Sequence, residues 1–533
     1  MGFIVDLDED PCLPLPPRRR PQVEHQVIDR SKRLTVYRML ADGNDTVPVG
    51  RLPDAVLHRV FWFLTGSPPG WHHRTPCRLG WLAVSHVCFR WRRLALASPD
   101  LWTHVFLPTH PDAVKATLIR SHDRPLNVTF AFIDTPQSLW PAHYPPETIR
   151  LVFQNMHRVK ALAMLQFVPA LQACMDSLPA HADQLSAFYG ATPHTTLFLS
   201  RLTGMSALRV VELNSVPVSF WKHCGAWPLL QKLRVESVAR GTAMADILGG
   251  LCSLRSLLLL HLPCSFLVPR GSTTYPTPAL HRLHAIELVG DLDNAASLLA
   301  HLRLGPFTRL FVDPRGTVQL TDNLSETMGK LCVVLTGLIN NSVPPVLSLQ
   351  LQNTGHNHFS LSGWTNDQLA DGAAWQGSTH GLKFGLRMPA LAPSIHELIV
   401  NLPLARVRSV RIADVNFADL GFLGGLVGLL REGSLRNIRA LEVCDVNFAW
   451  FDGVLLFDAE GGRARCPLQK LKTLVVISES QEGCIHVLCV ALQARQSVGM
   501  PLPEVKLSPL QIEHTPQHVL DALPAKIEPS PAA

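Results

Sequence analysis

The sequence has few aromatic and few charged residues. Aromatic residues make up 7% of the 533 positions, with only 4 Tyr, and charged residues make up 17%. Apolar residues make up 47%, whereas a disordered chain would be poor in them, so most of the chain is expected to fold around an aliphatic core. The net charge of +6 is small for this length and gives no electrostatic footprint for nucleic acid.

Long hydrophobic runs are also missing. The first ten residues, MGFIVDLDED, are acidic and contain no long apolar stretch, which argues against a signal peptide. The most apolar segment, residues 247–262, is interrupted by Arg255 and is too short to span a bilayer. We therefore expect no membrane partner and a cytoplasmic and/or nuclear location, in which the 12 scattered cysteines stay reduced.

Motifs for catalysis and metal binding are absent from the sequence. It contains no G-x-S-x-G nucleophile elbow, no phosphate-binding G-x-x-x-x-G-K-[ST], no H-E-x-x-H and no C-x-x-C. His72, His73 and Cys77 form one cluster of possible ligands, and His356 with His358 forms another. Zinc sites usually show two spaced pairs, which neither cluster does. We expect no cofactor, no metal and no catalytic residues.

What the sequence does contain is a recurring apolar phrase. From about residue 110 onward, short L-x-L pieces alternate with joints that contain Pro and Gly. Several have a further apolar residue three places earlier, which gives the L-x-x-L-x-L strand phrase of leucine-rich repeats. The central pairs are Leu126/Val128, Leu197/Leu199, Val211/Leu213, Leu233/Val235, Leu257/Leu259, Ile286/Leu288, Leu310/Val312, Leu349/Leu351, Val410/Ile412, Leu441/Val443 and Leu474/Val476.

The spacing of these phrases favours a repeat architecture. Successive pairs are 22, 24, 29 and 24 residues apart from Val211 to Leu310, and the last intervals are 31 and 33. One short strand cannot cover its own apolar face, whereas stacked units cover one another. The Asn or Cys that usually follows the strand is missing, and its place is taken by Val216, Asp291, Val415 and Val446. We predict an irregular leucine-rich-repeat-like α/β solenoid over residues 110–508. A generic α/β domain with Leu-rich strands remains the alternative.

Four other segments interrupt or flank this pattern. Residues 1–47 are rich in Pro and Arg and are expected to be largely disordered. Residues 331–339 predict a buried helix that Pro344 and Pro345 prevent from continuing. Residues 352–380 are rich in Asn, His, Ser, Gly and Thr and predict a long loop or insertion. Residues 509–533 contain several prolines and are expected to form a flexible tail.

The most specific signal lies near the N-terminus. In RLPDAVLHRVFWFL, Pro53 and Asp54 suit the first turn of a helix. The apolar residues that follow fall at helical spacing and form one stripe: Val56, Leu57, Val60, Phe61 and Leu64. The later phrase LGWLAVSHVCFRWRRLALASPDLWTHVFL predicts paired short helices, with Leu101 and Trp102 packing back on them. So few short helices bury little surface, and a partner on their exposed face would stabilise them.

These residues resemble the F-box family. The matching features are Leu52-Pro53, the apolar stripe, Val87-Cys88, Trp91-Arg92-Arg93-Leu94 and Leu101-Trp102. Residues 118–130 and 157–164 resemble the region after the F-box in fungal F-box proteins, and the insertion from Thr65 to Leu79 is longer than in a compact F-box. The resemblance implies a small all-α F-box domain over residues 48–107, followed by the α/β solenoid.

The resemblance also implies a partner and a role. F-box proteins dock on a Skp-type adaptor, which is attached to a cullin–RING ubiquitin ligase, and the rest of the chain captures a protein substrate. By matching positions, the residues that dock or shape the docking face are Leu52, Pro53, Leu57, Val60, Phe61, Val87, Cys88 and Trp91. The alternative for each is that it forms the core of the small domain.

On this interpretation the chain is not an enzyme, and the ubiquitin chemistry lies with other subunits. Two other functions stay open. One is a repeat-type protein-interaction scaffold without ligase attachment. The other is a hydrolase whose site is built from residues scattered along the sequence. The sequence also leaves open whether a substrate phosphate would bind Arg406, Arg408 and Arg411, which otherwise are solvent-facing positions on a strand.

Overall fold

The computed structural model covers the chain with gaps. It describes residues 47–65, 79–107, 110–130, 146–164, 174, 182–190, 201–268, 275–313, 324–342, 344–353, 358–365, 382–389, 398, 401–413, 437–444, 468–477, 484–497 and 499–529. Residues 1–46, the insertion between Thr65 and Leu79, the cluster around His72 and the strand expected at Leu197/Leu199 lie outside the described residues.

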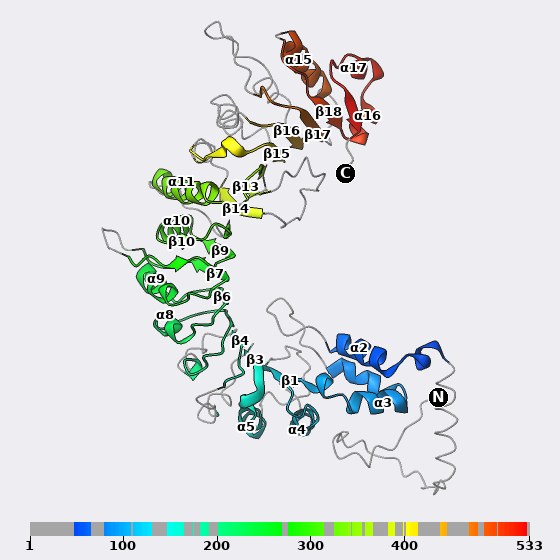
Figure 1. The fold of residues 1–533 in the computed structure, drawn as a ribbon, viewed down its shortest axis with the longest axis vertical. Coiled ribbons are helices and arrows are strands. Elements are labelled where there is room, and N and C mark those ends of the chain that lie inside the picture. The colour runs from blue at the N-terminus through cyan, green and yellow to red at the C-terminus, as the bar shows by residue number, and fades with distance from the viewer. Residues whose placement is uncertain are drawn as a thin grey trace. The chain divides into compact units, whose positions relative to one another are not determined.

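The protein is a mixed α/β structure with a large, mostly parallel sheet. The chain divides into two compact units, residues 1–235 and 236–533. The first unit begins with helices and continues into strands (Figure 1). This α/β class agrees with the class expected from the sequence.

The helices and strands of the first unit are short. They are η1 (Pro48–Arg51), α2 (Asp54–Leu64), η2 (Leu79–His86), α3 (Phe89–Leu96), η3 (Pro99–Trp102), β1 (His104–Leu107), α4 (Pro111–Arg120), β2 (Leu126–Phe130), α5 (Pro146–Gln154), η4 (Met156–Arg158), β3 (Val159–Met164), β4 (Ala187–Gly190), β5 (Val210–Leu213), α8 (Phe220–His223), η7 (Cys224–Ala226) and β6 (Lys232–Val235), where η denotes a 3-10 helix.

The strands of the first unit pair in chain order. Each of β1 to β5 is hydrogen-bonded in parallel to the next strand, ending at β6. Parallel neighbours need a crossover connection, and helices or irregular segments provide it between these strands. The sheet begins at His104, which the sequence placed in the helical domain, and it includes β3, whose apolar pair Leu162/Met164 was missed.

The second unit has longer helices. Its elements are α9 (Met244–Cys252), β7 (Leu259–Cys264), β8 (Ala279–Leu280), β9 (Ala285–Gly290), α10 (Leu292–Ala300), β10 (Arg303–Leu304), β11 (Arg309–Asp313), α11 (Leu324–Asn340), β12 (Ser348–Asn353), β13 (His358–Trp364), β14 (Leu382–Pro389), η8 (Leu404–Arg406), β15 (Ser409–Ala413), β16 (Ala440–Cys444), β17 (Thr473–Ile477), α15 (Cys484–Ser497), β18 (Glu504–Leu507), α16 (Pro509–His514), α17 (Gln517–Asp521) and β19 (Ile527–Pro529).

Most strand pairs of the second unit are parallel, with one antiparallel insertion. Strands β7, β9, β11 and β14 pair in parallel in that order. Strand β13 then lies antiparallel between β14 and β12. From β12 the parallel series continues through β15, β16, β17, β18 and β19. The sheet therefore continues past the insertion.

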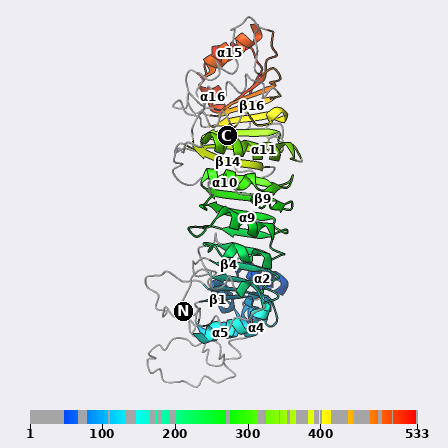
Figure 2. The same cartoon turned by 90° about the vertical axis from the view of Figure 1, so that its left-hand side faces the viewer.

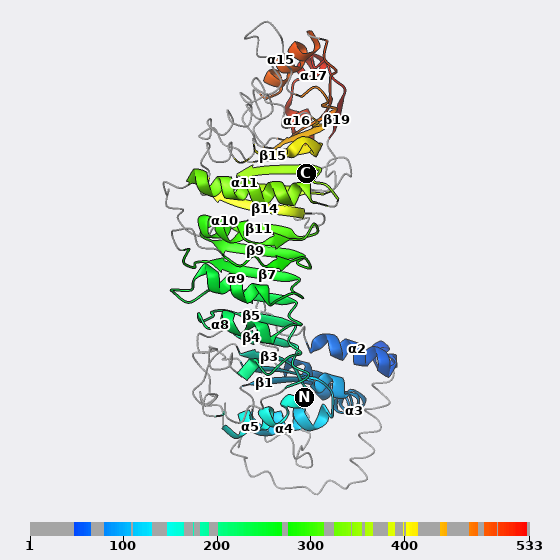
Figure 3. The same cartoon turned by 60° about the vertical axis from the view of Figure 1, so that its left-hand side comes forward.

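Helices of the second unit cover one face of its sheet. In Figure 1, α9, α10 and α11 all lie on the same side of β7, β9 and β11, and Figure 2 views these helices from their own side. Figure 3 shows β7, β9 and β11 as successive neighbours in the sheet. Alternate strand residues are fully buried, including Leu260, Leu262, Ile286 and Leu288. The buried residues of each strand form the core, and the intervening residues lie on the other face.

The apolar pairs identified in the sequence align across the sheet. Val211 is in register with Leu233, Ile286 with Leu310, and Leu441 with both Val410 and Leu474. One pair was placed wrongly, because β7 begins at Leu259 and buries Leu260 and Leu262. A run of consecutive leucines gives no alternation, so the sequence could not show which of them face inward.

Two segments expected to lack regular structure contain strands and helices. Residues 352–380 were expected to be a loop or insertion, but β13 lies within them and pairs with β12 and β14. The expected flexible tail from residue 509 instead contains α16, α17 and β19, and β19 pairs with β18. Ser508 caps α16 with Gln511 in a capping box. The expected buried helix at 331–339 lies within α11.

Several cysteines are buried free thiols. They include Cys174, Cys224, Cys264, Cys444 and Cys489, whereas Cys252 is exposed. Burial raises the thiol pKa of Cys224 and Cys444 to about 12, so both stay protonated near neutral pH. These two side chains act as small apolar groups. Within the described ranges, no helix is long and apolar enough to cross a membrane.

Side chains tie neighbouring strand segments together where a regular Asn ladder is missing. Asp291 accepts a hydrogen bond from the backbone N–H of Asn294 (2.8 Å) and so caps α10. The Asn294 amide in turn donates to the carbonyl oxygens of Cys264 and Phe266, both at 2.9 Å. Asp291, the residue that replaces the usual Asn, thereby starts the helix whose Asn294 binds the end of β7 and the residues after it.

We predict that Asn294→Ala loosens this part of the second unit. The substitution leaves two part-buried carbonyl oxygens without their donor, which costs about 1–3 kcal/mol. Hydrogen exchange measured by mass spectrometry should show faster exchange in β7 and α10. Asn340→Ala, at the exposed end of α11, is the control and should leave exchange in β7 unchanged. Equal exchange in both variants would contradict the bridging role of Asn294.

Candidate docking surface on the N-terminal helices

The N-terminal helices have a small core of their own. Seven buried side chains form it: Leu57, Phe61, Trp81, Val84, Ala95, Leu101 and Trp102. The rings of Trp81 and Trp102 meet edge to face, with centroids 5.0 Å apart. The indole N–H of Trp102 donates to the carbonyl oxygen of Ala95 (3.0 Å), so the polar end of this buried ring is satisfied. Leu101 and Trp102 thus pack back on the helices, as the sequence predicted.

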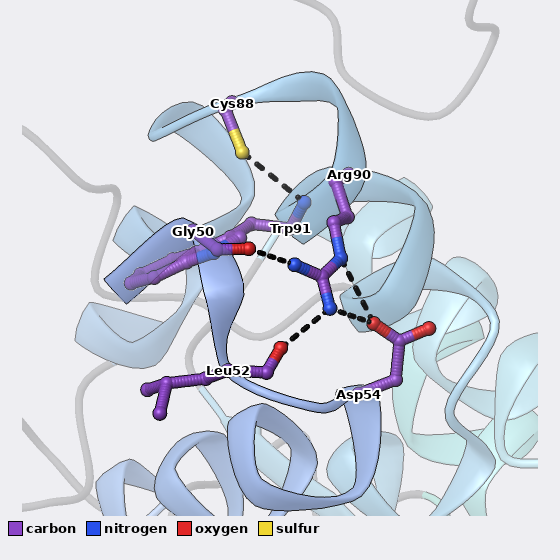
Figure 4. Close-up of polar contacts among 6 residues, drawn as sticks. All are labelled: Gly50, Leu52, Asp54, Cys88, Arg90 and Trp91. Atoms are coloured by element: carbon purple, nitrogen blue, oxygen red, sulfur yellow. Dashed lines mark hydrogen bonds and ion pairs between the residues drawn. The ribbon is translucent and has the colours of Figure 1, made fainter. Parts of the chain in front are cut away.

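Arg90 fastens the start of α2 to α3. Its guanidinium donates to the carbonyl oxygens of Gly50 and Leu52, the latter at 2.6 Å. It also binds Asp54 Oδ1 through Nε at 3.0 Å and through Nη2 at 2.7 Å (Figure 4). One fixed fork of donors therefore holds η1, the turn before α2 and the first residue of α2. The sequence analysis missed Arg90, because its partners lie 36 to 40 residues away and no local spacing connects them.

Cys88 and Trp91 have local structural roles. The Cys88 sulfur accepts a hydrogen bond from the Trp91 backbone N–H (3.5 Å), which places Cys88 at the N-cap of α3 (Figure 4). The Trp91 ring packs on Phe61, with centroids 5.2 Å apart, and is only part-buried. Both residues shape the surface more than they project from it.

Helix α2 presents two different apolar faces. Leu57 and Phe61 are 1% and 0% exposed and lie in the core, whereas Val60 is 43% and Phe63 65% exposed. The single stripe expected from the sequence is therefore split between the core and the surface. Large apolar side chains are exposed at nine positions of this segment: Val47, Val49, Val56, Val60, Trp62, Phe63, Leu64, Val87 and Phe89.

The exposed residues come from segments that Arg90 holds together. Val49 precedes Gly50, and Phe89 precedes Arg90, so the Gly50–Arg90 hydrogen bond joins the two segments that carry these apolar residues. Val56 and Val60 follow on α2, four residues apart and so on the same side of the helix. Burying apolar surface contributes about 25 cal/mol per Å², so a partner covering these side chains would gain affinity from them.

The eight residues selected from the sequence divide by position. Leu57 and Phe61 are core residues. Val60 and Val87 are exposed apolar residues, and Pro53 is exposed at the start of α2. Leu52, Cys88 and Trp91 are part-buried. The selection did not include five exposed apolar residues of α2 and α3: Val56, Trp62, Phe63, Leu64 and Phe89.

The helices connect directly to the sheet of the same unit. The Arg120 guanidinium of α4 lies over the Trp102 ring, 4.7 Å from its centroid. Arg124 pairs with Asp100 at 3.2 Å, and the backbone N–H of Asn127 donates to the carbonyl oxygen of Thr103. Surface ion pairs contribute little on their own. Together with the continuous chain into β1, these contacts fix η3 against α4 and β2.

One other candidate from the sequence is engaged within the fold. Arg411 on β15 pairs with Glu442 on β16 at 3.3 Å, and both side chains are largely buried. Arg411 is therefore not the solvent-facing arginine that the sequence pattern indicated, and its charge is balanced by a neighbouring strand. In the described part of the chain no three His, Cys, Asp or Glu side chains gather as a metal site.

Comparison of the sequence with protein-family models finds no match, and comparison with curated proteins finds no similar protein.

We predict that Arg90→Met releases the start of α2. The loss of charge-assisted hydrogen bonds from a part-exposed arginine should cost about 1–2 kcal/mol of local stability. Limited trypsin digestion should then cut after Arg59 about 5–30 times faster, because cleavage follows the population of the open state. Arg93→Met, an exposed position on the same helix, is the control. Unchanged cleavage after Arg59 in both variants would contradict the fastening role.

Proposed function

We propose that this chain is a substrate-recognition adaptor of a Skp–cullin–F-box type ubiquitin ligase. The observation that carries the proposal is the group of exposed apolar side chains around α2 and the start of α3, set on a small separate core. Monomeric proteins rarely leave contiguous apolar surface uncovered, and such surface marks a site of association. We name this group the α2 face and define it by Val49, Val56, Val60, Phe63 and Phe89.

The occupant we propose for the α2 face is a Skp-type adaptor. The support is the F-box resemblance of residues 48–107, in which the order Leu-Pro, apolar stripe, Val-Cys, Trp-Arg-Arg-Leu and Leu-Trp is preserved. In this domain Leu57 and Phe61 are buried, whereas Val60 and Val87 are exposed. This is compatible with an apolar stripe of which one part packs in the core and the other part contacts a partner.

For residues 110–508 we propose an irregular leucine-rich-repeat-like solenoid that captures a protein substrate. It is supported by the parallel pairing of successive strands and by the register of their Leu, Val and Ile pairs. Repeats of this kind present one continuous surface, made of the strand residues that do not enter the core.

On this proposal the chain supplies proximity rather than chemistry. The ubiquitin transfer takes place on other subunits, and the adaptor holds the substrate at an effective concentration near them. No catalytic residue or cofactor is assigned to this chain. The proposed location is cytoplasmic and/or nuclear, where such ligases work.

We predict that Val60→Asp combined with Phe63→Asp abolishes binding of the full chain to a purified Skp-type adaptor. Both side chains are exposed on α2, so the charges disturb the surface and leave the core intact. A pull-down should show capture by the wild-type chain and a loss of at least about a hundredfold in affinity in the double variant, because two desolvated charges would face an apolar partner.

Two controls separate docking from folding. Ile119→Asp places a charge on an exposed apolar residue of α4, outside the α2 face, and should leave binding unchanged. Leu57→Asp with Phe61→Asp charges the buried core and should instead unfold the helices, so it does not test docking. Failure of the folded wild-type chain to bind any Skp-type adaptor would sink the proposal and favour the interaction scaffold.

A further inference from the structure

Two cationic side chains lie next to each other on the sheet of the second unit. Arg309 and Lys383 stand one position before Leu310 and Phe384, which pair between β11 and β14. Leu310 and Phe384 are buried in the core. Because strand residues alternate between faces, Arg309 and Lys383 share the face opposite to that core. Like charges directly opposite each other on neighbouring strands are destabilising.

Lys383 is buried with little to compensate its charge. Its exposed fraction is 4%, and its ammonium donates to the carbonyl oxygen of Pro306 at 2.5 Å. Within the described part of the chain this is its one hydrogen-bond acceptor, and no carboxylate pairs with it. An ammonium has three N–H donors, so further donors can meet a ligand. Burial, together with the nearby Arg309, lowers the pKa of Lys383 to about 8.

Two exposed phenylalanines lie close in the sequence to residues that contact or adjoin the two cations. Phe307 directly follows Pro306, the residue that accepts from Lys383, and it is 64% exposed. Phe311 is 40% exposed and lies two residues beyond Arg309 on the same face. The Phe311 ring leans across Gly385 of β14, where a Cβ atom would come within 2.9 Å of the ring. Glycine at this position therefore allows the ring to lie against the strand.

We propose that Arg309, Lys383, Phe307 and Phe311 form a recognition subsite for a protein substrate, and that it binds an acidic side chain next to an apolar one. The cations meet the carboxylate, and the phenylalanines cover the apolar neighbour. The subsite deepens the proposed function, because it rests on substrate capture by the repeat region. It assigns a chemical class of substrate: an acidic–apolar peptide segment.

The neighbouring charges favour a carboxylate over a phosphate. Glu287 of β9 is in register with Phe311, and Asp313 lies at the end of β11 on the same face. Both carboxylates repel an anion, and they repel a doubly charged phosphate more strongly than a carboxylate. The two carboxylates therefore disfavour a phosphate at this position more than they disfavour a carboxylate.

Binding at this subsite should weaken as pH rises through about 8. A carboxylate binds the protonated form of Lys383, and the fraction of that form falls as pH passes the lysine pKa. Among the described residues, the charged groups on this face include Arg309, Glu287, Asp313 and, by its position on β14, Arg387. His261 contacts Glu287 at 2.8 Å and Glu236 at 3.7 Å.

The test is peptide selection on the full chain. Phage-displayed random peptides are selected for binding to the wild-type protein and counter-selected against Lys383→Met, which keeps the side-chain size without the charge. The enriched peptides should contain Asp or Glu next to an apolar residue. A synthetic peptide of the enriched sequence should lose about tenfold or more in affinity on Lys383→Met and on Arg309→Met.

Matched comparisons decide the outcome. Lys506→Met removes a strand lysine on β18, outside the subsite, and should bind the peptide like the wild type. Replacing the acid in the peptide by its amide should cost as much as Lys383→Met, and a phosphoserine peptide should bind less well. The subsite is overturned if no enriched peptide distinguishes wild type from Lys383→Met, if the enriched peptides carry no acid, or if phosphoserine binds better.

The result is independent of adaptor docking. Val60→Asp with Phe63→Asp lies in the first unit and should leave peptide affinity unchanged. Peptide binding without adaptor capture would remove the ligase attachment and keep the subsite. Adaptor capture with no discriminating peptide would remove the subsite and keep the attachment.

Discussion

The register of apolar pairs between neighbouring strands is the constraint on which both units depend. A strand of four to six residues, such as β5 or β9, buries its alternate side chains only when another strand presents its own at the same height. Val211 meets Leu233, and Leu441 meets Leu474, so each pair completes the core of the next. A slip of one residue would turn every apolar pair outward. Loops, helices and insertions can vary as long as this register is kept.

The antiparallel insertion shows how that constraint is met when the chain departs from the pattern. Strand β13 runs against its neighbours, yet Leu361 stays in register with Leu351 on one side and Leu386 on the other. Gly363 lies on the core side at the position of Phe384, where any Cβ would collide with the ring. The insertion is accepted because it preserves the apolar rows, and a glycine makes room where they would otherwise clash.

The sequence predicted those features that repeat or that are local. The apolar pairs, the helix start at Pro53-Asp54 and the packing of Leu101-Trp102 were all visible, since each depends on neighbours in the chain. What escaped were contacts over long separations, such as the Arg90 fork that joins residues 36 to 40 positions apart. The sequence also could not show which side chains of α2 face the core. Helical spacing shows that Leu57 and Val60 are near each other, but the apolar stripe was wide enough to serve two faces, and tertiary packing decided which residues were buried.

The division of α2 into two faces is the reason why we propose a docking role for the N-terminal helices. The core of the N-terminal helices contains only seven buried side chains and does not include Phe63 and Phe89. The apolar area of these two exposed side chains therefore contributes nothing to the stability of the helices. Polar contacts add to the stability that this small core provides. Arg90 joins η1 to α3, and Arg120 with Arg124 joins η3 to α4. Lys383 has an analogous position in the second unit, since a buried ammonium beside an arginine costs stability that the surrounding apolar rows must supply. The exposed phenylalanines of the N-terminal helices and the buried Lys383 are both locally unfavourable. A complementary partner would reduce the free-energy cost of each.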